Sequence, residues 1–387
     1  MIYLDNQATT PCDPRVLEAM WPWFASRAGN PHSVEHAAGR GAADAVADAR
    51  AQVAALIGAE PREIVFVSGA TEANNLAIKG AARFSGPSTR RRLITAATEH
   101  KCVLESVRDL AAEGFDPVIL PVTPEGGLEP DVLREALATP TLLVSVMAAN
   151  NESGFLTDVA TLAALAHAAG ARVHSDLAQA AGKIPIDVNA LGIDLASLSA
   201  HKLYGPPGIG ALYVRHRPRM RLAPQLSGGG QERGLRAGTV PTALAVGFGA
   251  ACAIARAELG DESARIAVLR DRLLEGFSER VPCVAVNGPL DLRLPGNLSL
   301  RFPGVRALDL IAACPALAVS TGSACTSADV APSHVLTALG LSPEQAAATL
   351  RLSIGRFNSP ADIDNAVHLL ADAYAALAPA RRKLAKA

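Results

Sequence analysis

Short apolar runs alternate with helical patterns between about residues 60 and 215. The runs are rich in β-branched residues, as buried strands are, and the stretches between them repeat apolar residues at helical spacing. The predicted strands are 64–67, 93–96, 142–147, 172–175, 195–198 and 210–214, and the predicted helices are 73–82, 103–112 and 162–169. This alternation predicts an α/β fold with a mostly parallel central sheet and helices on both faces.

The pattern changes in the last third of the chain. A polar, Gly-rich segment over 226–238 predicts a loop, and helical patterns follow over 242–259 and 263–280. Beyond Val281, short strands and helices mix, with turn residues at 287–288 and 295–297. We therefore predict a large domain over residues 14–256 and a smaller α+β domain made of residues 1–13 and 257–387.

Composition narrows the possible partners. The 36 basic and 37 acidic residues give a net charge of −1, so no overall field favours nucleic acid or an anionic membrane. The first residues lack a cationic leader, and no apolar stretch is expected to reach the roughly 18 residues of a membrane span. The chain is expected to be cytoplasmic, with no direct nucleic-acid or membrane partner.

Cysteine spacing argues against a metal or disulfide framework. The six cysteines, at positions 12, 102, 252, 283, 314 and 325, form no Cys-x-x-Cys pair. In a reducing compartment most of them are expected to be structural thiols, and no metal site is predicted.

Polar side chains follow the predicted strands where those strands end. They are Thr71, His100, Asn151, Asp176 and Lys202, each placed after or at the end of a different strand. Ligands of open α/β sheets bind outside the carboxyl ends of the strands, so these five side chains are expected to meet in one crevice.

Three of these positions suit pyridoxal 5′-phosphate (PLP). The turn 68–71 opens a helix, whose N-terminal N–H groups favour a phosphate. Asp176 can pair with a protonated pyridine nitrogen, and Lys202, between an apolar run and a Gly/Pro turn, can form an imine. Taken singly, each has an ordinary alternative: an N-cap, a capping aspartate or a solvated lysine.

Other residues fit roles around such a cofactor. His100 could stack on the ring and move protons, Gln179 and Asn151 could hydrogen-bond oxygens, and Ser199 and His201 could ligate phosphate. Arg351 could hold a carboxylate in bidentate fashion. Cys325 lies in a run of small residues, 320–328, which predicts a mobile loop with an accessible thiol.

Motifs along almost the whole chain resemble the PLP-dependent cysteine desulfurases, of the fold-type I, class V aminotransferase group. The similarity is strongest to the iron–sulfur-assembly type with a long mobile cysteine loop. The matching segments are 3–11, 29–33, 68–72, 98–100, 150–154, 199–206, 228–233, 322–327 and 351–356.

The resemblance implies a role for each residue. Lys202 would hold PLP as a Schiff base, Asp176 would pair with its ring nitrogen, Gln179 with its ring hydroxyl, and His100 would stack on it. Asn151 and Arg351 would hold the substrate carboxylate. The phosphate would be bound by Ala70, Thr71, Ser199 and His201, together with Thr239 from a neighbouring subunit.

The same resemblance implies a reaction. Cys325 would attack the sulfur of L-cysteine bound to PLP, which gives L-alanine and a persulfide on Cys325. A homodimer and a sulfur-acceptor protein, such as an iron–sulfur scaffold, are expected partners. The sequence leaves the acceptor open.

Two other readings compete. A selenocysteine lyase, or another PLP lyase or aminotransferase of the same fold, would use the same cofactor residues. A non-catalytic phosphate-binding α/β protein would explain only the turn 68–71, and the Gly-x-Gly-x-x-Gly motif of dinucleotide binders does not follow a strand here.

Overall fold

The computed structural model describes residues 1–86, 89–322 and 332–384. Its central sheet has seven strands in the order β2-β8-β7-β6-β5-β3-β4. Their bounds are β2 Ile64–Val67, β3 Arg92–Ala96, β4 Asp116–Leu120, β5 Thr141–Ser145, β6 Arg172–Asp176, β7 Leu195–Ser199 and β8 Gly210–Val214. Only β8 is antiparallel to its neighbours, so the predicted mostly parallel α/β sheet is confirmed.

Apolar side chains cover both faces of this sheet. Along β2, Ile64 and Phe66 enter one hydrophobic cluster while Val65 and Val67 enter another, because successive strand residues point to opposite faces. The surrounding helices are α1 Pro14–Ala25, α2 Ala37–Leu56, α3 Ala70–Phe84, α4 Lys101–Asp109, α5 Pro130–Ala136 and α6 Val159–Ala168. The strands are therefore held in a fully covered layer, and their carboxyl ends form a fixed edge.

A second unit lies beyond one end of the sheet. The antiparallel strands β9 Ala285–Val286, β10 Asn297–Arg301 and β12 Thr349–Ser353 form it with β1 Ile2–Tyr3, which pairs with β11 Leu317–Ala318. Its helices are α8 Ala307–Ala313, α9 His334–Ala338, α10 Pro343–Ala347 and α11 Pro360–Leu384. Leu4 belongs to the core of this unit, so both ends of the described chain contribute to it.

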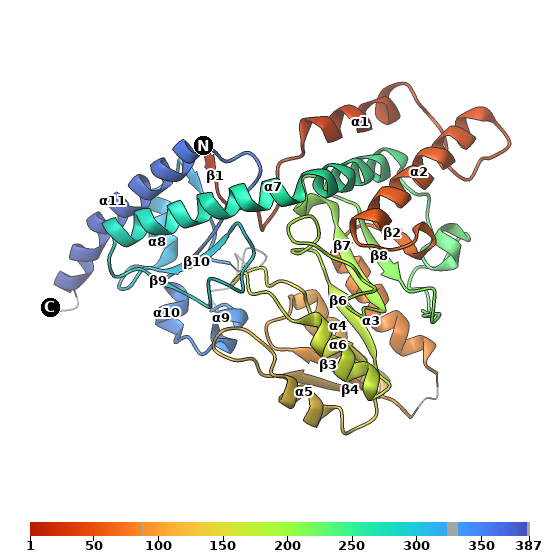
Figure 1. Ribbon diagram of the computed structural model, residues 1–387, viewed down its shortest axis with the longest axis horizontal. Coiled ribbons are helices and arrows are strands. Elements are labelled where there is room, and N and C mark those ends of the chain that lie inside the picture. Colours follow the sequence, from red (N-terminus) through yellow and green to blue (C-terminus); the bar gives the residue numbers. More distant parts are fainter. Residues whose placement is uncertain (87–88, 323–331, 385–387) are drawn as a thin grey trace.

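One long helix connects the two units. The two helical patterns expected over 242–259 and 263–280 form a single helix, α7 Thr242–Arg280, which runs lengthwise across the molecule in Figure 1. The intervening Gly260 costs a helix about 1 kcal/mol, too little to end one packed on both sides. Its buried residues up to Ala255 join the core of the sheet unit, and those from Ile266 join the core of the second unit. The predicted boundary near residue 257 falls between them and stays a prediction.

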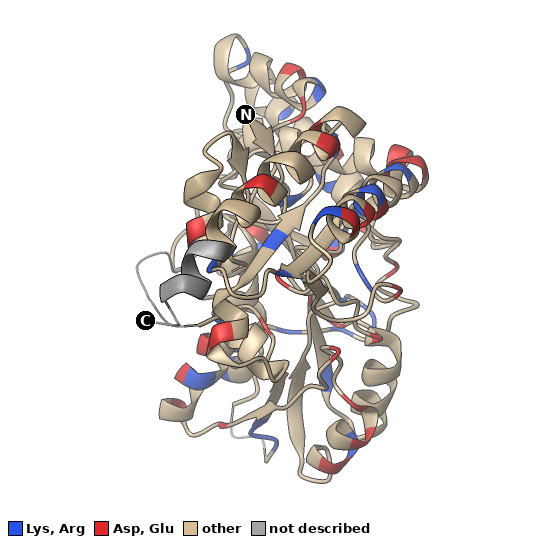
Figure 2. Cartoon of the chain, turned by 90° about the vertical axis from the view of Figure 1, so that its left-hand side faces the viewer, with Lys and Arg blue, Asp and Glu red and all other residues tan. Residues whose placement is uncertain are grey.

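The same helix corrects one expectation from the sequence. α7 contains an 18-residue stretch that is long and apolar enough to cross a membrane, and 44% of that stretch is buried within the structure. The apolar residues of α7 pack into the two cores, since the helix contacts α1 and α2 at one end and α11 at the other. Basic and acidic residues are interspersed on the side shown in Figure 2.

Candidate active site

A cavity of about 580 Å³ lies at the carboxyl ends of the central strands. It is lined by ten of the residues singled out in the sequence, namely Ala70, Thr71, His100, Asn151, Asp176, Gln179, Ser199, His201, Lys202 and Arg351. The sheet edge brings most of them together, and β12 adds Arg351 from the second unit. Thr239 lies in an adjoining hollow, which shares Ser68 and Gly208 with the cavity. Cys325 lies outside the described residues, although Gly322, three positions before it, lines the cavity.

Asp176 ends β6 as a buried carboxylate. Its Oδ2 accepts a hydrogen bond from Asn74 Nδ2 at 2.7 Å, and its Oδ1 accepts one from the Ala178 amide at 2.9 Å. Among the described residues no Lys or Arg forms an ion pair with it. A buried charge is costly unless it is paired, so the site favours a cationic group beside Asp176.

The start of α3 supplies the anion-binding end of the cavity. Its N-cap is Gly69, which has no side chain to satisfy the first N–H groups of the helix. A side-chain carbon at Gly69 would come within 3.9 Å of Ser199 Oγ, so the glycine keeps this corner open. His201, also at this end, has its pKa lowered to about 4 by burial and by Lys202, so the ring is neutral at pH 7. Backbone N–H groups, hydroxyls and a helix dipole together suit a phosphate.

Besides Lys101 at the start of α4, Lys202 lines the cavity. It ends a short 3₁₀ turn after β7, and its Nζ lies 2.7 Å from Gln7 O and 2.6 Å from Ala8 O. A further lysine, Lys183, has its pKa lowered to about 7 by burial. Its amine would therefore be partly unprotonated, and so reactive, at neutral pH. Geometry decides between them, because Lys183 lines a smaller adjoining hollow and donates to Gln179 Oε1 at 3.1 Å.

Gln179 is fixed at both ends of its amide. Its Oε1 accepts from Lys183, and its Nε2 donates to Gln7 O at 2.9 Å. This assigns the nitrogen to the side of Gln7 and Lys202, where its second hydrogen can reach a ligand oxygen. Lys183 was not singled out in the sequence, and Gln7 lay in the matching segment 3–11 without a predicted role.

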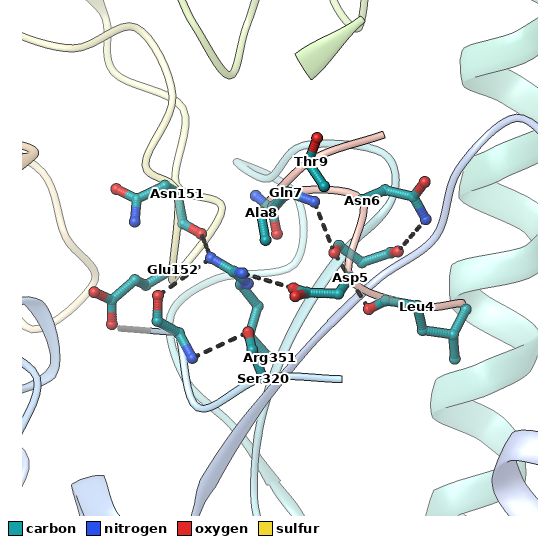
Figure 3. Close-up of polar contacts among 12 residues, drawn as sticks. Leu4, Asp5, Asn6, Gln7, Ala8, Thr9, Asn151, Glu152, Ser320 and Arg351 are labelled. Atoms are coloured by element: carbon teal, nitrogen blue, oxygen red, sulfur yellow. Dashed lines mark hydrogen bonds and ion pairs between the residues drawn. The ribbon is translucent and has the colours of Figure 1, made fainter. Parts of the chain in front are cut away.

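Arg351 joins three segments that are far apart in the chain. Its Nη2 donates to Asp5 Oδ1 at 2.7 Å, and its Nη1 donates to Asn151 O at 2.8 Å and to Gly322 O at 3.2 Å (Figure 3). Within the described part of the chain, the buried Arg351 Nε and Asn151 Oδ1 have no hydrogen-bond partner. Buried polar atoms are rarely left so, and these two lie where a bound molecule can complete them.

His100 is the N-cap of α4 and shares a small polar cluster. Its Nδ1 accepts from the Cys102 amide at 3.2 Å and lies 2.9 Å from Cys102 Sγ. Asn74 Nδ2, already bound to Asp176, lies 3.1 Å from the same sulfur. Sequence reasoning missed Asn74, although a polar residue on the otherwise buried face of α3, one turn after Thr71, was an available signal. It also treated Cys102 as an ordinary structural thiol.

Comparison with known proteins agrees with this geometry. Residues 2–366 match the family model of class-V aminotransferases. The chain is 51% identical over 369 residues to a "Cysteine desulfurase IscS" of Rickettsia akari (strain Hartford), covering 95% of this chain and 90% of that one. A second relative of the same name, from Rickettsia rickettsii (strain Iowa), is 49% identical over 381 residues, covering 98% and 93%.

Solved structures show the same fold. A "NifS-like protein" superposes with a TM-score of 0.89 at 35% identity and covers 96% of this chain and 98% of its own. A structure titled "SspA in complex with cysteine" has a TM-score of 0.80 at 36% identity, covering 93% and 100%. A NifS-like protein from Rickettsia africae ESF-5 gives 0.86 at 31% identity, covering 97% and 99%.

The chain therefore belongs to the class-V aminotransferases, a family of PLP-dependent enzymes. Within that family its named relatives are cysteine desulfurases, which confirms the group predicted from the sequence. The cavity fits PLP on its own terms. A buried carboxylate without a Lys or Arg ion pair among the described residues suits a pyridinium, an open helix N-terminus suits a phosphate, and the Lys202 amine lines the same cavity.

Proposed function

We propose that this protein converts L-cysteine to L-alanine, collects the sulfur as a persulfide on Cys325, and passes it to an acceptor protein. The relatives named cysteine desulfurases support this reaction. The single structural observation that carries it is Gly322, which lines the PLP-suited cavity and is held there by Arg351. Cys325, the proposed nucleophile, follows Gly322 by three positions in the sequence.

Each cavity residue has a proposed task. PLP, when bound, supplies the electron sink for chemistry at the substrate's α and β carbons. Lys202 Nζ holds the cofactor, and Asp176 supplies the negative charge facing its ring nitrogen. Gln179 donates to the ring oxygen from its free hydrogen at Nε2.

The two ends of the cavity bind anions. The N–H groups at Ala70 and Thr71, with Ser199 and His201, hold the phosphate. Arg351 and Asn151 hold the carboxylate of cysteine: Arg351 Nε is a buried donor without a partner among the described residues, and Asn151 would donate from Nδ2. His100 moves a proton at the substrate side.

Sulfur transfer then balances without an outside oxidant. The Cys325 thiolate attacks the substrate sulfur, an S–S bond forms, and the carbon–sulfur bond breaks with its electron pair left on carbon. That carbon takes up a proton, which completes L-alanine, and Cys325 holds the sulfur as a persulfide. Iron–sulfur cluster assembly or a thiolation pathway is the proposed destination, in the cytoplasm.

The proposal includes a homodimer. Thr239 is exposed and lines the hollow next to its own chain's cavity but not the cavity itself, which supports a role at the phosphate of a neighbouring subunit. The division into a large domain over 14–256 and a small domain carrying the cysteine loop is proposed with it.

The Cys325→Ala variant tests the nucleophile. It should bind PLP and cysteine but form no persulfide when supplied with ³⁵S-cysteine, and alanine production should fall by several orders of magnitude. Cys283→Ala, which removes an exposed thiol on the second unit, is the matched control and should behave as wild type. Full alanine production by Cys325→Ala would favour another PLP lyase or an aminotransferase.

A further inference from the structure

Asn74 fixes which atoms donate and which accept hydrogen bonds in the polar cluster that it forms with Asp176, Cys102 and His100. Its side chain is fully buried, 2.7 Å from Asp176 Oδ2 and 3.1 Å from Cys102 Sγ. A carboxylate only accepts hydrogen bonds, so the amide nitrogen, not the oxygen, must face Asp176. Nδ2 then directs one hydrogen to Asp176 and the other to the sulfur, while Oδ1 has no partner among the described residues.

The sulfur must therefore direct its own hydrogen elsewhere. Burial raises the pKa of Cys102 to about 12, so the group is a thiol at neutral pH, and Thr71 also hydrogen-bonds it. His100 Nδ1 lies 2.9 Å from the sulfur and accepts from the Cys102 amide, which as a backbone N–H can only donate. Nδ1 thus carries no proton in this arrangement, and the S–H hydrogen is directed to it.

We propose that Cys102 is a positioning residue that fixes the tautomer of His100, with the proton on Nε2 and the lone pair on Nδ1. The Cys102 amide, which can only donate, requires the lone pair on Nδ1, and the thiol that Asn74 turns toward the ring donates to the same atom. The resting enzyme then offers an N–H donor, not a base, at the ring nitrogen left for the cavity. The consequence for catalysis rests on the proposed function, but the tautomer itself does not.

Charged groups on several elements also act on His100. Burial is the largest influence and lowers the pKa of His100, while Asp176 on β6 raises it. Lys202 on the 3₁₀ turn, His334 on α9 and Lys101 on α4 lower it. A thiol that donates to Nδ1 favours the neutral ring and adds to the lowering. Removing this donor should raise the pKa of His100 by about half a unit to one unit, the shift that corresponds to one neutral hydrogen bond.

Nitrogen NMR of the full-length purified protein, labelled with ¹⁵N-histidine, tests the proposal. The His100 signals are assigned by their loss in His100→Asn. In wild type at pH 7.5, Nε2 should carry the proton and Nδ1 should not. Cys102→Ala should raise the midpoint of His100 protonation, and Cys102→Ser, which keeps a donor, should restore it. Cys283→Ala should leave it unchanged.

Three results would overturn the proposal. These are a proton on Nδ1 in wild type, a Cys102→Ala titration equal to that of wild type, or a Cys102→Ser titration equal to that of Cys102→Ala. A correct tautomer in a protein that yields no alanine from cysteine would instead contradict only the proposed function. Active desulfuration with the wrong tautomer would contradict only the role of Cys102.

Discussion

Lys202 and Lys183 show that the position of a lysine, and not only its pKa, decides whether it can hold the cofactor. Both lie beside the site, and burial lowers the pKa of Lys183 to about 7, which leaves a large share of its amine unprotonated near neutral pH. Of these two lysines, Lys202 lines the cavity, while Lys183 is bound to the amide of Gln179. Placement, rather than pKa, therefore selects Lys202 for the cofactor.

This selection predicts where PLP becomes attached. After borohydride reduction of the PLP-loaded protein, peptide mapping should find the pyridoxyl group on Lys202. Lys202→Ala should lack the covalent absorption band, and Lys183→Met is the control that should retain it. A pyridoxyl group on Lys183, or a full band in Lys202→Ala, would contradict the assignment.

The residue scale also shows what sequence reasoning could reach. Ten predicted residues line one cavity, and all but Arg351 lie at or just after the end of a strand of the central sheet, which the apolar pattern predicts. Asn74 and Lys183 were missed, and Gln7 was given no role within the segment 3–11, because their importance comes from packing. Asn74 matters through a partner on β6, and Gln7 matters through Lys202, almost 200 residues away.

At the scale of elements, β6 carries a buried histidine at the centre of the sheet. His174 Nδ1 lies 2.7 Å from Ser145 Oγ on β5, and its Nε2 lies 3.0 Å from Ser197 Oγ on β7. Burial lowers its pKa from 6.5 to about 3, so the ring stays neutral in the folded protein. It pairs with the strands on either side of the one that positions Asp176.

This histidine predicts a loss of stability in acid. Below pH 6.5, His174 binds a proton in the unfolded state but not in the folded state, so the stability of the folded protein falls as the pH falls toward 3. Between pH 7.5 and pH 5 the contribution is about 2 kcal/mol. Urea unfolding at both values should show a smaller loss in His174→Gln, which cannot titrate, than in wild type. Equal losses in the two proteins would contradict this role.

The sequence predicted the bounds of a strand correctly where the local residues alone determine them. β2 and β8 match their predicted bounds, because apolar β-branched runs end there at glycine turns or charged residues. β4 was not predicted, since its run includes Asp116 and Pro117 and is completed by pairing with β3. α7 was divided in two because Gly260 reads as a break until packing on both sides is known.

At the scale of the whole molecule, the cavity is built from segments that lie far apart in the sequence. Arg351 on β12 connects Asp5, Asn151 and Gly322, so the second unit closes the cavity of the first. Thr239 extends this dependence to a proposed second subunit. No sequence pattern determines such joins, because they follow from the relative placement of whole units.

Mixed dimers test the role of Thr239. When a Thr239→Ala subunit pairs with a Lys202→Ala subunit, the one site with a lysine receives an intact Thr239 from its partner and should bind PLP as wild type. When the double variant pairs with wild type, that site should lose PLP faster, by roughly tenfold for one lost hydrogen bond to phosphate. If instead the first mixed dimer lost PLP faster and the second bound it as wild type, Thr239 would act in its own subunit's site.

The most direct test of the account is one reaction in one tube. The purified PLP-loaded protein is mixed with L-cysteine under reductant, its visible spectrum is recorded, and alanine and sulfide are assayed together. The account predicts a yellow protein, a spectral shift on adding cysteine, and alanine and sulfide in equal amounts. A yellow protein whose spectrum shifts but which yields neither product would contradict the claim that this cavity desulfurates cysteine.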